Sequence, residues 1–492
     1  MNTLKSFVLT IFLFSTTLFL SAKEAYNISI TVKGYPNKLF YLGYYYGDKQ
    51  YLRDSARTDA AGKMVFKGDR ALEGGIYLVA TDNKSLLFDF VVTEQFFSLE
   101  TDSVDVIANM KVKGSKENDI FFDYTKFTAR VGRQAQEYEK KLNEAKGKKD
   151  TAGERKSTES LRGALNELSS YRKNTLSQYP DALISKIFRM MKEVDVPEPP
   201  KRANGSIDSN FQYNYYYHHY FDNFDFADDR ITRTPVFNPK FETFMKKMTI
   251  QFPDSINKSA DMVLALAKNG KENFKYCLYW ITNYYESSEY MGMDAVFVHM
   301  IDKYYATGKA YWVDSTLLYK LMNKADMERN NLIGRRAVNL SLPDTANKYH
   351  TLFNIDAKYT LLLFWDATCG HCKEEVPKIL TAFNDFNKTT SVKQKKFFDV
   401  FAVSSTPNPE DWKKYMRENK IKWTNVYDPY NESNFHRVYD VTSTPVIYIL
   451  DENKKIIAKR LSGGQVKDFI ENYEKDKENM PPIYNDVAPV EH

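Results

Sequence analysis

The chain has 492 residues, and its 69 Lys and Arg residues nearly balance its 64 Asp and Glu residues, so the formal net charge is only +5. No strongly basic stripe interrupts this balance, and nucleic acid is therefore not implied as a partner. Three cysteines are too few for a disulfide-stapled scaffold. A chain of this length predicts two to four domains.

Residues 1–22 are predicted to be an export signal. Lys5 supplies a positive charge, an apolar stretch of 15 residues runs from Ser6 to Leu20, and Ser21-Ala22 offers a small-residue cleavage site. That stretch is shorter than the ~20 residues that a membrane-spanning helix needs. We therefore expect an exported protein of the periplasm or cell envelope. It would touch the membrane only through this segment, if the segment stays uncleaved.

Residues 23–115 are predicted to form a β domain. Apolar and polar residues alternate from Tyr26 to Val32, and after a turn signal at 34–37 the apolar pattern resumes at Leu39. Turn signals separate further strand-like runs, which lie at 64–66, 76–79, 86–92 and 96–99. Short strands at this spacing favour a small β-sandwich or open barrel, and nothing in it offers a catalytic constellation.

Residues 116–335 are predicted to be all-helical, because apolar residues recur there at helical spacing from Phe121 onwards. The charged stretch 147–156 is interpreted as the connector between the first two helices. The aromatic run 211–221 could line a groove for an unfolded or peptide substrate, but a helix with one face in a core is the favoured interpretation. We expect Cys277, in an apolar stretch, to be a small buried hydrophobe and not a redox thiol.

Residues 336–475 alternate predicted strands and helices, as in a parallel or mixed sheet. The apolar run 360–365 is typical of a buried strand, and Cys369-Gly370-His371-Cys372 follows it at the start of a predicted helix. Backbone N–H groups and the dipole at a helix N-terminus favour the thiolate of Cys369. Cys372 falls one turn later, near enough for a disulfide. The pair can therefore attack a disulfide and resolve the mixed disulfide that results.

Local signals predict the remaining elements of this segment. A strand at 398–404 precedes a helix that Asn408 caps, with Pro409 at its first position. A strand is expected at 423–427, a hairpin at 446–458 and a last amphipathic helix from Val466 to Tyr473. Residues 476–492 are expected to form a disordered tail.

The segment Phe364 to Pro377 resembles the active-site segment of the thioredoxin superfamily, in its exported TlpA/ResA-like branch. Thr444-Pro445 resembles the cis-proline loop of that fold, and the helix and strand at 408–427 resemble the insertion typical of this branch. The resemblance covers residues 336–475. The β region and the helical region before it are similar to accessory domains in envelope proteins of Bacteroidota.

The resemblance implies a C-terminal α/β thioredoxin-like domain and a role for each matching residue. Cys369 would be the nucleophile and Cys372 the resolving thiol. Glu375 would shuttle the proton that Cys372 must lose, unless it is a solvated helix residue. Substrate contacts would come from Trp365, Thr444 and Pro445. The partners would be proteins that carry disulfides or dithiols and an external electron donor or acceptor, with no cofactor and no metal.

Three positions depart from the family pattern. Thr368 stands where the family usually has a Trp, and Leu363 stands where plain thioredoxins have a buried acidic residue. His371 is shared with protein disulfide isomerases, and its imidazole can stabilise the Cys369 thiolate and raise the reduction potential. The direction of electron flow therefore stays open: a net disulfide oxidase competes with a reductase or isomerase.

Other functions fit the sequence less well. A peroxidase of the peroxiredoxin type needs Pro-x-x-x-Thr-x-x-Cys. Leu362 stands at the proline position of this motif and Asp366 at the threonine position, so the motif is absent. Structural zinc takes four ligands, and no second CxxC follows; a copper-chaperone role remains an alternative. A non-enzymatic envelope binding protein with a passive structural disulfide is the other alternative, because most of the chain has no assigned chemistry.

Overall fold

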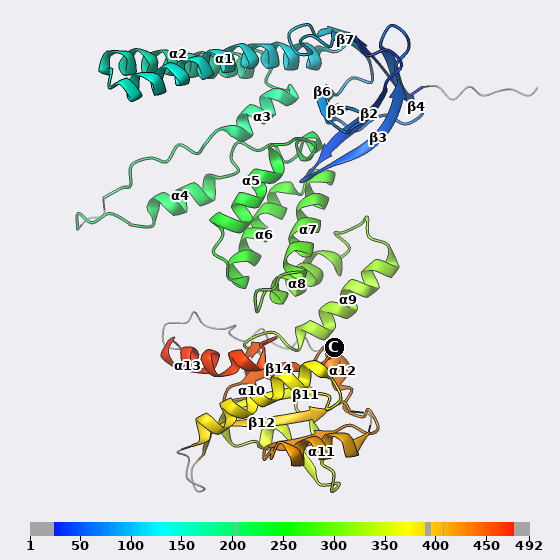
Figure 1. The fold of residues 1–492 in the computed structure, drawn as a ribbon, viewed down its shortest axis with the longest axis vertical. Helices are drawn as coiled ribbons and strands as arrows, with labels where there is room; N and C mark the ends of the chain where they lie inside the picture. The colour runs from blue at the N-terminus through cyan, green and yellow to red at the C-terminus, as the bar shows by residue number, and fades with distance from the viewer. Residues whose placement is uncertain (1–23, 202–203, 389–394, 407, 477–492) are drawn as a thin grey trace, which may run out of the picture. The chain divides into compact units, whose positions relative to one another are not determined.

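The computed structural model describes residues 24–201, 204–388, 395–406 and 408–476, so the predicted export signal and the tail from residue 477 lie outside the described residues (Figure 1). The chain divides into two compact units. One comprises Met1–Phe244 with Lys268–Asn273, and the other comprises Met245–Ala267 with Phe274–His492. Across the described ranges, no helix combines the length and the apolar character needed to cross a membrane.

The predicted β domain is a sandwich of two four-stranded sheets. Their strand orders are β4-β1-β7-β8 and β3-β2-β5-β6. Ile28 and Phe66 from the first sheet and Phe40 and Phe90 from the second meet in one core, so the prediction of a sandwich is confirmed. The strands are β1 (Tyr26–Lys33), β2 (Leu39–Tyr46), β3 (Lys49–Arg57), β4 (Lys63–Gly68), β5 (Gly75–Thr81), β6 (Leu86–Val92), β7 (Phe96–Asp102) and β8 (Lys111–Lys113).

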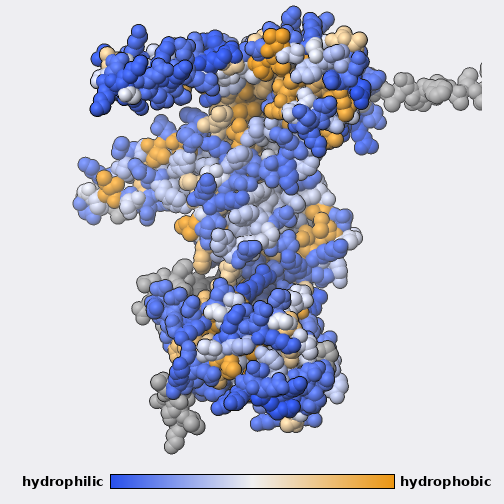
Figure 2. Space-filling view, in the orientation of Figure 1, coloured by the Kyte–Doolittle hydropathy of each residue, from blue (hydrophilic) through white to orange (hydrophobic). Residues whose placement is uncertain are grey.

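Two long paired helices follow, α1 (Lys116–Lys148) and α2 (Thr151–Gln178). The side chain of Ser115 caps α1, and that of Asp150 caps α2 by accepting the Gly153 N–H at 3.0 Å. Only two residues separate the helices, so the predicted connector 147–156 is wrong in its extent: most of it is helical. Figure 2 shows hydrophilic side chains over most of this pair, as its charged sequence leads one to expect.

The prediction of an all-helical middle region is confirmed. Cys277 of α7 is fully buried, and burial raises the pKa of its thiol, as expected for a small hydrophobe. In the aromatic run, α4 has no buried residue, and the core begins only at Tyr220 and Phe221. The remaining elements are α3 (Leu183–Met191), α4 (Phe211–His219), η1 (Asp229–Arg233), α5 (Phe237–Thr243), η2 (Phe244–Met248), α6 (Pro253–Ala267), α7 (Lys271–Glu286), α8 (Asp294–Met300), η3 (Ile301–Tyr305) and α9 (Ser315–Arg329).

The C-terminal part of the second unit is built on a five-stranded sheet of order β13-β12-β11-β14-β15. Strands β11, β12 and β13 are parallel, whereas β14 and β15 are antiparallel to their neighbours. The strands are β11 (Ala357–Trp365), β12 (Lys396–Ser404), β13 (Thr424–Tyr427), β14 (Val446–Leu450) and β15 (Ile456–Lys459). The other elements are β9 (Ser341–Pro343), β10 (Tyr349–Thr351), η4 (Leu352–Asn354), α10 (Gly370–Asn387), α11 (Pro409–Glu418), α12 (Phe435–Val438), η5 (Gly463–Gln465) and α13 (Val466–Asp476).

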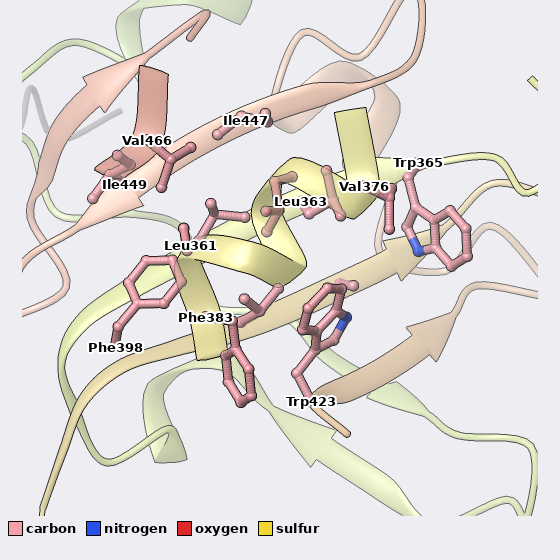
Figure 3. Close-up of a cluster of buried hydrophobic side chains, with 14 of the residues drawn as sticks. Leu361, Leu363, Trp365, Val376, Phe383, Phe398, Trp423, Ile447, Ile449 and Val466 are labelled. Carbon is pink, nitrogen blue, oxygen red and sulfur yellow. The ribbon is translucent and has the colours of Figure 1, made fainter. Parts of the chain in front are cut away.

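Strand β11 lies at the centre of this sheet, because its side chains are apolar on both faces. Leu361, Leu363 and Trp365 point into a core with α10 and α13, which Figure 3 shows. Leu362 and Phe364 point into a second core on the other face. Each fully buried Leu or Phe contributes roughly 1.5–3 kcal/mol, so the strand that leads to Cys369 is firmly held.

Segments from the helical region cover the outer edge of β15. The Gly334 N–H donates to the Ile456 carbonyl at 2.7 Å, and the Ile456 N–H donates to the Arg335 carbonyl at 2.8 Å. Further along, the Lys459 N–H donates to Met291 Sδ at 3.2 Å. The Lys459 ammonium is paired with the Asp294 carboxylate of α8, and both side chains are buried. The helices of the second unit are thus joined to its sheet at this edge.

Candidate active site

Cys369 is the N-cap of α10 and follows β11 after a short turn. Asp366 shapes that turn, because its Oδ1 accepts the Thr368 N–H at 2.8 Å and the Cys369 N–H bonds back to the Asp366 carbonyl at 3.2 Å. The Ser405 N–H donates to the Trp365 carbonyl at 2.9 Å and ties the end of β11 to the segment after β12. The predicted strand-to-helix junction is confirmed.

The sulfur of Cys369 is half-buried and lies where α10 favours negative charge. The backbone N–H of Cys372, together with that of His371, holds the pKa of the Cys369 thiol below its ordinary value. The same sulfur lies 3.6 Å from the Thr444 carbonyl oxygen. Cys369 is thus favoured as a thiolate at a position that a partner molecule can reach.

The sulfur of Cys372 has the opposite environment. The side chain is 1% exposed, and burial raises the pKa of its thiol to about 11. Its sulfur accepts a hydrogen bond from the Asp366 N–H at 3.4 Å. All three cysteines of the chain are free thiols. The site therefore offers one partly exposed thiol of lowered pKa beside one sheltered thiol of raised pKa.

The Thr444–Pro445 peptide bond is cis, as the resemblance implied. Both residues are half-buried, and they lead directly into β14 beside β11. This places the loop against Cys369. Substrate contact by Thr444 and Pro445 remains a prediction.

Trp365, predicted to contact substrate, lies in the hydrophobic core. Its side chain is 1% exposed, and its ring centroid lies 5.3 Å from that of Tyr415 in α11. The prediction is wrong because Trp365 follows the alternation of β11 and points to the same face as Leu361 and Leu363.

Glu375 contacts groups other than the cysteines. Its carboxylate accepts the Gly463 N–H and pairs with Lys378 at 2.6 Å, and the Lys378 bond holds the pKa of Glu375 below its ordinary value. These contacts join α10 to η5. They correct the alternative of a simply solvated helix residue, and they lend no support to proton transfer for Cys372.

The other positions singled out in the sequence, His371, Thr368 and Leu363, differ in their exposure. The His371 side chain is exposed on the first turn of α10, and Thr368 is exposed just before it. Leu363 is fully buried, and it occupies the position on β11 at which plain thioredoxins carry a buried acidic residue. In the described part of the chain, no group of three or more His, Cys, Asp or Glu residues is arranged to hold a metal ion.

Sequence reasoning missed the support that Thr406 gives to the turn before Cys369. The Thr406 hydroxyl accepts the Ala367 N–H at 2.9 Å and donates to Asp366 Oδ1 at 3.2 Å. Asp366 followed two residues later by Thr368 is the local signal for such a turn. The contribution of Thr406 comes from the end of β12 and depends on the tertiary fold.

Comparison with known proteins matches each region of the chain separately. A family model described as thioredoxin-like matches residues 356–456, and two domains of unknown function, DUF4369 and DUF5106, match residues 26–121 and 148–331. A thioredoxin-like protein of Haemophilus influenzae is 26% identical over 130 residues, which is 26% of this chain and 71% of that relative. Sporulation thiol-disulfide oxidoreductase A of Bacillus subtilis is 27% identical over 115 residues, 23% of this chain and 66% of the relative.

Among solved structures, a domain of a possible thiol-disulfide isomerase from Cytophaga hutchinsonii is 39% identical, with a TM-score of 0.28. It covers 30% of this chain and 97% of that domain. A CxxC at the start of α10, on this sheet and with these relatives, defines a protein of the thioredoxin superfamily. Within it, the chain is a TlpA-like thiol–disulfide oxidoreductase, and the matches to two domains of unknown function lie before its thioredoxin-like region.

Proposed function

We propose that this oxidoreductase reduces or isomerises disulfides of exported proteins, with Cys369 as the nucleophile and Cys372 as the resolving thiol. The observation that carries the proposal is the opposite environment of the two sulfurs. The pKa of Cys369 is lowered at the helix N-terminus, whereas burial raises that of Cys372. A passive structural disulfide has no need of such a difference.

The reaction runs in two exchanges. The Cys369 thiolate attacks a substrate disulfide, so that a Cys369–substrate disulfide forms and one substrate sulfur leaves as a thiolate. Cys372 then loses its proton and attacks the Cys369 sulfur, which forms the Cys369–Cys372 disulfide and releases the second substrate thiol. Two electrons pass from the protein to the substrate, and an external dithiol donor returns them. In isomerisation, a different substrate thiol attacks the mixed disulfide instead.

Trapping the mixed disulfide tests this assignment. With a polypeptide disulfide as substrate, Cys372→Ser should accumulate a covalent complex through Cys369 that reductant releases, and Cys369→Ser should form none. Cys277→Ala, which removes a buried thiol of α7, is the matched control and should turn over normally. Full activity of the Cys369→Ser variant would contradict the proposal.

The net direction of electron flow is tested by the reduction potential of the Cys369–Cys372 pair. Equilibration with defined glutathione ratios and trapping of free thiols would give a value of about −270 mV for a reductase, or of about −180 mV and above for an isomerase or oxidase. The exposed His371 beside Cys369 favours the higher value, because an imidazole there stabilises the dithiol form. The variant His371→Ala should then lower the potential.

We also propose that the protein acts outside the cytoplasm, where disulfides persist. The apolar segment at Ser6 to Leu20 carries this part of the proposal. Cell fractionation with an antibody against the chain, together with N-terminal sequencing of the recovered protein, checks both export and cleavage after Ala22. Recovery with the cytoplasmic fraction would contradict it.

A further inference from the structure

The loop at residues 287–293, between α7 and α8, is attached to the end of β15. Met291 Sδ accepts the Lys459 N–H at 3.2 Å, and Asp294, directly after the loop, forms the buried pair with the Lys459 ammonium. Gly292 adopts a φ of 88°, a conformation that favours glycine, and it is buried against the protein. The loop is therefore held in one position relative to the sheet.

The end of β15 to which the loop is attached is the active-site end of the sheet. The Arg460 N–H, just past Lys459, donates to the Ile447 carbonyl at 3.1 Å. Ile447 pairs with Leu363 of β11, two residues before that strand ends. Strand β14 begins directly after the cis Thr444–Pro445 bond, and β11 leads into Cys369. The loop and the reactive sulfur thus lie at the same end of one sheet, two strands apart.

The tip of the loop is apolar and exposed. Tyr290 is 77% exposed and Met291 is 38% exposed. A tyrosine offers a large, rigid contact area, and the part of the Met291 side chain that stays exposed adds a polarizable apolar surface beside it. Because the loop is fixed by Lys459, little ordering is left to occur when a partner binds. An exposed apolar tip held in this way is suited to contact another molecule.

We propose that Tyr290 and Met291 extend the substrate-binding surface of the Cys369 site and take an extended, apolar polypeptide segment that flanks the substrate's cysteine. This inference rests on the proposed function. Neighbouring strands lie about 4.8 Å apart, so β15 lies about 10 Å across the sheet from β11, with β14 between them. An extended chain rises about 3.3 Å per residue, so roughly three residues beside the cysteine reach β15, and about two more reach the loop beyond it. Oxidised glutathione has only one residue on either side of each cysteine and does not reach the loop.

The experiment compares two disulfides in single-turnover reactions of the pre-reduced full chain. One is the disulfide of an unfolded polypeptide with apolar residues beside the cysteine, and the other is oxidised glutathione. In Tyr290→Ser, the ratio of the second-order rate constants, polypeptide over glutathione, should fall about five- to tenfold, as the loss of one aromatic contact implies. Tyr349→Ser is the control, because Tyr349 is 61% exposed on the hairpin beside β13, the opposite edge of the sheet, and its ratio should equal that of the wild type.

A covalent readout accompanies the kinetics. Cys372→Ser, trapped as a mixed disulfide with a peptide that carries a photo-crosslinker five residues from its cysteine, should crosslink to residues 287–293. An unchanged ratio in Tyr290→Ser, an equal fall in Tyr349→Ser, or crosslinks only elsewhere would overturn the inference. If the wild type reacts with neither disulfide, the proposed function itself fails; if it reacts with both and the ratio stays unchanged, only the role of the loop fails.

Discussion

Lys459 at the end of β15 and Asp294 at the start of α8 form an ion pair whose side chains are only 4% and 6% exposed. The two residues are 165 positions apart in the sequence. Attraction between buried charges offsets their desolvation only while both are present. The packing of α8 on the thioredoxin-like sheet therefore depends on the presence of both charges of this pair.

Removal of one member of this pair should be costly. Lys459→Met leaves the Asp294 carboxylate buried and unpaired, and we expect it to lower the free energy of unfolding by about 3–5 kcal/mol. The double variant Lys459→Met/Asp294→Leu should regain most of that loss. Denaturant unfolding measures both. The control Lys141→Met, from an ion pair with both side chains more than half exposed, should change stability by less than about 0.5 kcal/mol.

Glu328 of α9 should make the stability of the second unit depend on pH. Burial, with the nearby Asp294 carboxylate, raises the pKa of Glu328 to about 7. The folded protein then binds this proton more tightly than the unfolded chain, so the free energy of unfolding falls as the pH rises from about 4.5 to about 7. Glu328→Gln should be more stable than the wild type at pH 8, by up to roughly 3 kcal/mol, with the advantage gone below about pH 4.5. A difference that stays constant from pH 5 to pH 8 would contradict this.

The two active-site thiols should react with iodoacetamide in different pH ranges. The thiolate is the form that reacts, and the lowered pKa of Cys369 means that this form is populated at lower pH than in an ordinary cysteine. Cys372, with a pKa of about 11 and almost no exposure, should react only at strongly alkaline pH. Mass spectrometry of timed samples measures each site. In denaturant the two rates should become equal, and equal rates in the folded protein would disprove the assignment.

Glu375→Gln distinguishes a structural role from proton transfer. The pKa of Glu375 is lower in the folded protein than in the unfolded chain, so its bonds to Lys378 and Gly463 stabilise the fold at pH values above the unfolded pKa. This stabilisation is lost as the pH falls through the folded pKa. We expect a loss of about 1–2 kcal/mol at pH 7 that disappears in acid. The rate at which Cys372 resolves the mixed disulfide should stay within about twofold of the wild type. A tenfold slower rate would restore the proton-transfer role.

The placement of Cys369 could be predicted because its signals are local. An apolar run made β11 recognisable as a buried strand, and the periodicity after Cys372 did the same for α10. Asn408 and Pro409 likewise marked the start of α11, where the Asn408 side chain accepts the Glu410 N–H. These elements depend on neighbouring residues, so pattern and capping suffice.

The missed features depend on distant partners. Glu375 bonds to Gly463, 88 positions later in the chain, and no local pattern indicates that contact. Strand β3 has no buried residue and pairs along β2, so its sequence lacks the alternation of a half-buried strand. The loop at 287–293 is brought to the active-site end of the sheet by its attachment to β15, and no local pattern indicates that attachment.

The burial of Cys372 also constrains the kinetics of the whole cycle. With one sulfur sheltered, the electron donor and the disulfide substrate must both exchange through Cys369. They therefore compete for a single surface and react in turn, so the initial rates should follow a ping-pong pattern, with parallel double-reciprocal lines and inhibition by an excess of either partner.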